Sequence, residues 1–135
     1  MVDMPPGTGD VPLTIFQKLP IEGIVSVTTA QSLVSLIVEK AARMAEMMNV
    51  PILGLVTNMA YVTCPDCGKK IEIYGGPKTE EIAHMHNIPV SAEIPLDPKI
   101  SQYVDSGRVE DLMVDYLNPI RDALIELDNI SKNEE

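Results

Sequence analysis

The sequence predicts an α/β fold in which helices flank a parallel sheet. Three apolar stretches rich in β-branched residues, at 22–28, 51–57 and 88–94, alternate with segments of helical periodicity. Strands that are apolar along their whole length are typical of parallel sheets covered on both faces, and the segments between them predict right-handed crossovers. Aromatic residues make up only 4% of the chain, and such an aliphatic core is common in sheets covered by helices.

For residues 1–48 the sequence predicts one loop, two helices and one strand. Residues 1–10, MVDMPPGTGD, form a loop rich in proline and glycine, and a short helix follows at 11–19. After the first strand, residues 30–48 show the clearest helical spacing of apolar side chains in the sequence. Charged residues lie mostly on the opposite face of this helix, which is typical of a helix packed on a sheet.

The second part of the chain adds an irregular segment and three further helices. Residues 61–76 leave the sheet, carry both cysteines and end in two glycines. Pro119 lies inside the last predicted helix and must kink it or begin a new first turn. The tail at 129–135 is expected to fray. The helices are expected at 78–85, 97–106 and 109–127.

Length and charge limit the possible functions. The 135 residues, 45% of them hydrophobic, suit a single domain spanning 1–135. Ten basic and 20 acidic residues give a net charge of −10, which argues against binding to nucleic acid or to an anionic membrane. No segment has the ~18 consecutive apolar residues of a membrane span, and the N-terminus does not resemble a secretion signal. Two cysteines cannot form a secreted disulfide framework, so we expect a cytoplasmic protein.

The predicted topology also limits where a ligand can bind. Parallel sheets hold ligands at the carboxyl ends of their strands, which here are residues 3–10, 58–68 and 93–97. In the first of these segments, Gly7 and Gly9 let the backbone approach a bulky anion, and Asp3 can hold a Mg²⁺-bound water beside a phosphate. An isolated PPG would be a surface turn, but the whole string DMPPGTGD favours a phosphate site.

The second segment contains two thiols, Cys64 and Cys67, in the string CPDCG. The spacing lets both thiols face one metal across a tight turn. A zinc knuckle needs four ligands, so His84 and His86 would have to complete it. A [4Fe–4S] cluster needs about four thiolates, which two chains related by a two-fold axis would supply. The same two thiols could instead form a thioredoxin-like redox pair, normally found at a helix start, or a reduced pair without any ligand.

Asn58 directly follows the second strand. Its amide can donate and accept hydrogen bonds together, as the reading of an adenine edge requires. An asparagine in this position is also a common turn residue, so the residue alone is compatible with either role. The acidic residues between 110 and 128 are interpreted as the solvated face of a helix.

Four segments, in the same order and spacing, resemble one known family. They are VDMPPGTGD at 2–10, VSVTTAQ at 25–31, GLVTNMAYVTCPDCG at 54–68 and EIPLDPKI at 93–100. Over residues 1–115 the chain resembles the C-terminal half of the Mrp/ApbC-type iron–sulfur cluster carrier ATPases. These belong to the MinD/ParA-like deviant Walker A class of P-loop proteins. The resemblance implies a partial P-loop NTPase domain of Rossmann-like form.

The resemblance also implies roles for individual residues. Asp3 matches the Walker B aspartate linked to Mg²⁺, and Gly7 lies in the loop near the γ-phosphate of ATP. Asn58 matches the asparagine that contacts adenine, and Pro95 lies in the segment along the base. The cysteines at 64 and 67 match the pair that bridges a [4Fe–4S] cluster across a homodimer. The family passes such clusters to apo iron–sulfur proteins under the control of ATP.

The chain departs from the family in several places. The glycine-rich loop GKGGVGKS that holds the phosphates is not in the sequence, and neither is the switch region that positions the attacking water. Thr57 stands where glutamate is usual, and Ala60 where serine is usual. Without the P-loop strand, the strand at 22–28 is left as an unpaired edge. We therefore expect that a longer gene product or a separate polypeptide supplies the other half, and that this chain alone does not hydrolyse ATP.

Two functions besides that of a cluster carrier are compatible with these departures. A metal-binding or scaffold module without catalytic activity could keep the cysteine loop after losing the P-loop. A ParA-like partitioning ATPase is disfavoured by the cysteine pair and by the lack of a terminal basic amphipathic helix.

Overall fold

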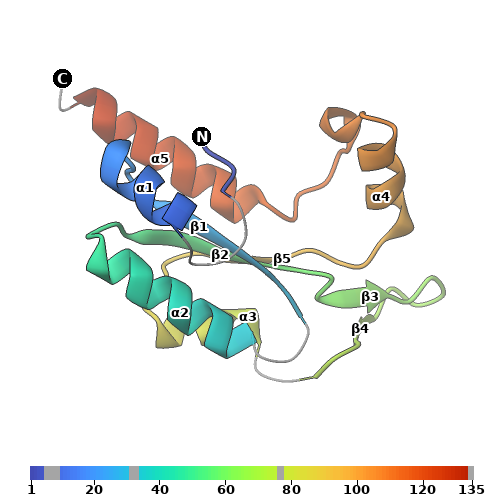
Figure 1. Cartoon of the computed structure of the whole chain (residues 1–135). Coiled ribbons are helices and arrows are strands. Elements are labelled where there is room, and N and C mark those ends of the chain that lie inside the picture. Colours follow the sequence, from blue (N-terminus) through green and yellow to red (C-terminus); the bar gives the residue numbers. More distant parts are fainter. Residues whose placement is uncertain (5–9, 31–33, 76–77, 134–135) are drawn as a thin grey trace.

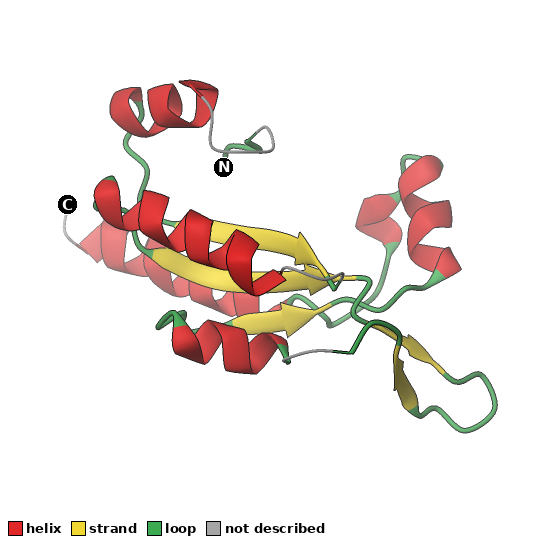
Figure 2. Ribbon diagram, turned by 60° about the horizontal axis from the view of Figure 1, so that its bottom comes forward, coloured by secondary structure: helices red, strands yellow, loops and turns green. Residues whose placement is uncertain are grey.

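The computed structural model describes residues 1–4, 10–30, 34–75 and 78–133. Its centre is a parallel sheet of three strands, β1 (Ile24–Thr29), β2 (Ile52–Asn58) and β5 (Ser91–Glu93), in the order β1-β2-β5. Helices cover both faces of this sheet (Figures 1 and 2). The predicted α/β class is therefore confirmed, although the third strand is shorter than the predicted 88–94.

The central strand β2 shows why its sequence is continuously apolar. Successive side chains of a strand point to opposite faces, so Leu55 and Val56 enter two different cores. Leu55 packs with residues of α2 (Val34–Met47) and α3 (Thr79–Met85), whereas Val56 packs with Ala92 and with Ile120 of α5 (Asn118–Asn133). Both faces of β2 are thus buried, as a crossover topology requires.

The C-terminal helices differ from the prediction. The predicted helix at 109–127 is instead a short 3₁₀ turn, η1 (Val109–Asp111), followed by α5. Pro119 lies in the first turn of α5, where its missing N–H is not needed. The tail predicted to fray is helical as far as Asn133, and the Ser131 hydroxyl donates a hydrogen bond of 2.9 Å to Glu22 Oε1, which anchors it.

Three further elements lie outside the sheet and its covering helices. The helix α1 (Asp10–Lys18) follows the N-terminal segment, and α4 (Pro98–Asp105) follows β5. The cysteine-bearing segment forms an antiparallel hairpin of β3 (Tyr61–Thr63) and β4 (Lys70–Glu72). This hairpin, which the sequence did not predict, projects from the end of the parallel sheet (Figure 2).

One edge of the sheet is open in the described part of the chain. There β1 pairs with β2 on one side, and the Val27 side chain is 66% exposed. An exposed strand edge presents unpaired backbone donors and acceptors to another strand. Among the described residues, no helix combines the length and the hydrophobicity needed to cross a membrane.

We expect Leu55→Ala to destabilise the fold strongly. Leu55 is fully buried between β2, α2 and α3, so truncation leaves a cavity and should lower the free energy of unfolding by about 2–5 kcal/mol. Leu36→Ala, on the exposed side of α2, is the matched control and should cost less than about 1 kcal/mol. Urea unfolding followed by circular dichroism measures both, and equal losses would contradict the assignment of Leu55 to the core.

Candidate functional site

The two cysteines lie in the tight turn that closes the β3–β4 hairpin. The Cys64 N–H donates to the carbonyl of Lys69, and the Gly68 N–H donates to the carbonyl of Cys64, each at 2.9 Å. Gly68 has φ +71°, a conformation that glycine adopts without steric cost. The sequence CPDCG therefore builds a closed turn in which Cys67 is exposed and Cys64 is partly exposed.

The environment of Cys64 favours its thiolate. Hydrogen bonds from the backbone N–H groups of Cys67 and Asp66, with a further one from the Cys67 side chain, hold the pKa of the Cys64 thiol below its usual range. The thiolate is the form of cysteine that binds metals. The hairpin tip therefore combines access for a metal with a lowered pKa of the Cys64 thiol.

The histidines predicted as fallback ligands do not join the cysteines. His84 lies in α3 and His86 follows that helix as its C-cap. Among the described residues, no group of three or more His, Cys, Asp or Glu side chains is placed to hold one metal ion. The histidine-completed zinc knuckle is therefore not formed within the described part of this chain.

Asn58 and Pro95 lie on two backbone segments that hydrogen bonds hold together. The Ile94 N–H donates to the carbonyl of Thr57, and the Ala60 N–H donates to the carbonyl of Ile94, each at 2.9 Å. The Asn58 Oδ1 accepts a 2.9 Å hydrogen bond from the N–H of Met59, whose φ is +55°. The side chain thus stabilises the turn after β2, while Pro95 is buried beside it.

Asp3 is not brought to this end of the sheet. Asp3 is exposed, and both views place the N-terminus near α1 rather than near the hairpin that follows β2 (Figures 1 and 2). Gly7 lies outside the described residues. The proposed Mg²⁺ and phosphate roles of Asp3 and Gly7 therefore stay predictions.

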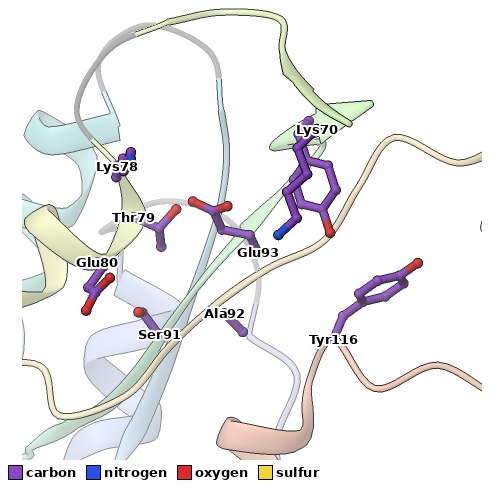
Figure 3. Close-up of a pocket in the computed structure, with 9 residues that line it drawn as sticks. Lys70, Lys78, Thr79, Glu80, Ser91, Ala92, Glu93 and Tyr116 are labelled. Carbon is purple, nitrogen blue, oxygen red and sulfur yellow. The ribbon is translucent and has the colours of Figure 1, made fainter. Parts of the chain in front are cut away.

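A cavity of about 360 Å³ lies where the hairpin meets the sheet, and sequence reasoning missed it. Figure 3 shows the Glu93 carboxylate between Thr79 and Lys70. The Lys70 ammonium lies 4.5 Å from the centre of the Tyr61 ring. The lining residues come from five separate parts of the chain: Tyr61, Lys70, Lys78, Thr79, Glu80, Ser91, Ala92, Glu93 and Tyr116.

The phenols of this cavity stay protonated. Burial, followed by the charges of Glu93 and Asp115, raises the pKa of Tyr61, and burial also raises the pKa of Tyr116. Beside them the Thr79 hydroxyl donates a buried hydrogen bond of 2.9 Å to Thr57 Oγ1. One signal for part of this cavity was present in the sequence: Tyr61 and Lys70 each lie three residues outside the cysteine pair, as in a hairpin built around that turn.

Comparisons with known proteins show which family this chain belongs to. A family model of the ParA group, described as NUBPL iron-transfer P-loop NTPase, matches residues 1–127. The iron-sulfur cluster carrier protein of Clostridium perfringens is 38% identical over 93% of this chain and 43% of its own length. The mouse iron-sulfur cluster transfer protein NUBPL is 41% identical over 80% of this chain and 34% of its own.

A solved structure has the same fold as this chain. The nucleotide-binding protein of Archaeoglobus fulgidus, in complex with ADP and with cobalt, has a TM-score of 0.76 and 43% identity. The match covers 84% of this chain and 47% of that one. This chain therefore spans less than half the length of the relatives it matches. With a family match over nearly its whole length and the same fold in a solved relative, the chain belongs to the NUBPL iron-transfer P-loop NTPase family of the ParA group.

Proposed function

We propose that this chain is the cysteine-bearing part of an iron–sulfur cluster carrier. The observation that carries the proposal is the exposed thiol pair of Cys64 and Cys67, whose turn lowers the pKa of Cys64. The names of the relatives, iron-sulfur cluster carrier and transfer proteins, support the same cargo. Exposure at a hairpin tip suits a carrier because the cargo has to leave the site again.

The cluster is proposed to bridge two copies of the chain. A [4Fe–4S] cluster takes about four thiolates, and each chain has two cysteines. A two-fold axis between two hairpin tips would place the thiolates of both copies around one cluster. The homodimer then passes the cluster to apo iron–sulfur proteins of the cytoplasm.

Control by a nucleotide is proposed to need a P-loop half, which would hold the phosphates of ATP. Asn58 and Pro95 lie on segments joined by backbone hydrogen bonds, and the family resemblance gives both residues a place at the adenine end of ATP. The glycine-rich loop that would hold the phosphates is not in this sequence. Asp3 with Mg²⁺ and Gly7 near the γ-phosphate would therefore act only when a P-loop half pairs with the open edge of β1.

Cluster loading should convert the chain into a dimer. Anaerobic loading with iron and sulfide, followed by light scattering, should give one cluster per two chains and a doubled mass. Cys64→Ser should remove this loading-dependent dimer because one thiolate per chain cannot complete the coordination. The control Glu72→Ser changes an exposed side chain of the same hairpin and should dimerise like the wild type.

Two results would contradict this proposal. One is a protein that stays monomeric while holding a complete [4Fe–4S] cluster, since all the ligands would then come from one chain. The other is stoichiometric zinc at half occupancy without any cluster formation. That second result would favour the metal-binding or scaffold module.

A further inference from the structure

The two thiols at the hairpin tip lie in contact with each other. The Cys67 side chain donates a hydrogen bond to the Cys64 sulfur. Cys67 is exposed and Cys64 is partly exposed, so small molecules in solution can reach both sulfur atoms. Two accessible thiols held side by side are the reactants from which a disulfide forms.

The backbone of the turn suits a disulfide between these two residues. The Cys64 N–H donates to the carbonyl of Lys69, and the Gly68 N–H donates to the carbonyl of Cys64, each at 2.9 Å. Residues three positions apart around a tight turn have Cα atoms within about 7 Å, and disulfides join Cα atoms about 4.4–6.8 Å apart. The two cysteines are therefore held close together while both are still reduced.

The base of the hairpin is fastened to the body of the fold. The Ala60 N–H donates to the carbonyl of Ile94 at 2.9 Å, and the Leu96 N–H donates to the carbonyl of Tyr61 at 2.8 Å. The Tyr61 side chain is buried, whereas the cysteines belong to neither hydrophobic core. A bond between the two sulfurs therefore changes the tip and leaves both cores intact.

The contact between the thiols also decides which disulfide forms. The chain has two cysteines, so each has one partner in its own chain and competing partners in other chains. A partner joined by a short linker is present at an effective concentration on the order of millimolar. At micromolar protein concentrations, closure within one chain is therefore faster than the linking of two chains.

A disulfide at this position is easily reversed. Disulfides stabilise a fold mainly by restricting the unfolded chain, and this restriction grows with the length of the closed loop. The loop between positions 64 and 67 is very short, so the bond adds little stability. Exposed disulfides are also among those that thiols reduce most readily. These properties suit a reversible modification of the hairpin tip.

We propose that Cys64 and Cys67 form a reversible disulfide within one chain by exchange with a low-molecular-weight disulfide, and that the oxidised hairpin takes up no cluster. The tip then has two states. The reduced state presents both thiols, and the oxidised state presents neither.

The exchange takes two steps. The thiolate of one cysteine attacks the small disulfide, forms a mixed disulfide with half of it and releases the other half as a thiolate. The second cysteine then loses its proton to a released thiolate and attacks the protein sulfur of the mixed disulfide, which releases the remaining half. The two protein thiols are thus oxidised to one disulfide, and the small disulfide is reduced to two thiols.

Oxidation of the tip has a direct consequence for the cargo. The thiolate is the form of cysteine that binds metals, and the disulfide consumes both thiols of the chain. The described residues contain no group of three or more His, Cys, Asp or Glu side chains that could take over. The block on cluster uptake rests on the proposed function, because it takes the cysteines to be the cluster ligands.

Mass spectrometry of the reduced, cluster-free chain tests the exchange. After treatment with excess glutathione disulfide, the wild type should have lost the hydrogen atoms of both thiols and should carry no glutathione. Dithiothreitol should restore both thiols. Cys64→Ser and Cys67→Ser should each stop at the mixed disulfide and retain glutathione. A wild type that keeps its thiols, retains glutathione or mainly forms disulfide-linked pairs of chains would overturn the proposal.

Two matched glycine variants test whether the turn promotes ring closure. Gly68, in the cysteine turn, has φ +71°, and Gly107, after α4, has φ +69°; a Cβ added at either meets nothing within 4 Å. Alanine is strained in this left-handed conformation. Gly68→Ala should therefore slow the conversion of mixed disulfide to closed disulfide about fivefold, whereas Gly107→Ala should close as fast as the wild type. Equal rates in the two variants would contradict closure by a preformed turn.

Loading with iron and sulfide separates this proposal from the proposed function. The disulfide form should take up no cluster, and dithiothreitol should restore uptake; equal uptake by both forms would overturn the block. If the reduced chain takes up a cluster but glutathione disulfide leaves its thiols unjoined, the disulfide proposal fails and the carrier function stands. If the disulfide forms and reverses but the reduced chain takes up no cluster, the reversible oxidation stands and the carrier function fails.

Discussion

Serine at both Cys64 and Cys67 is expected to abolish cluster binding. A hydroxyl is a poor ligand for iron in such clusters, and the described residues offer no group of three or more His, Cys, Asp or Glu side chains that could replace the thiols. The wild type, loaded anaerobically with iron and sulfide, should develop broad absorption near ~400 nm. The double variant should show none of this absorption and should retain no iron or sulfide after desalting.

The fold of the double variant provides the control for this experiment. Both cysteines lie in an exposed turn outside the two cores, so the two substitutions should change the free energy of unfolding by less than about 1 kcal/mol. A double variant that folds and binds iron and sulfide as well as the wild type would refute the role of these cysteines.

The isolated chain is expected to bind ATP very weakly and to show no hydrolysis above background. Contacts to the phosphates supply most of the affinity in P-loop proteins, and the glycine-rich loop that makes them is not in this sequence. Adding a polypeptide half that carries this loop should produce Mg²⁺-dependent hydrolysis, because the added strand can pair with the open edge of β1.

Asp3→Ala should abolish the activity of this reconstituted protein, since the family resemblance gives Asp3 the Mg²⁺-linked position. Asp122→Ala removes an exposed carboxylate of α5 and is the matched control, which should retain full activity. Phosphate release measures both variants. Rapid hydrolysis by the 135-residue chain alone, or an unaffected Asp3→Ala variant, would contradict the assignment of these roles.

Local sequence patterns predicted the parts of the fold that depend on burial. The apolar run of β2 predicted a parallel strand, because its alternate side chains enter opposite cores. Helical spacing predicted α2, and Pro119 predicted a possible new first turn, which α5 has. These features depend on a few residues and their immediate neighbours, so one sequence was enough to identify them.

The candidate site was only partly predictable from the sequence. The string CPDCG predicted a turn with two thiols, and the family resemblance named Asn58 and Pro95. The hairpin around the cysteines was missed because each of its strands has only three residues. The cavity at its base was missed because Tyr61, Thr79 and Tyr116 are far apart in the chain.

By itself the sequence determined the α/β class, the order of the parallel strands along the chain and the thiol pair, because periodicity, turn residues and motif spacing are local properties. Only the tertiary structure decided that Tyr116 returns to the base of the cysteine hairpin and that α4 packs mainly against the 3₁₀ turn η1. It also decided that Ser131 anchors the last helix to Glu22. These features depend on contacts between segments that are far apart in the sequence. Local sequence patterns do not determine which distant segments come into contact.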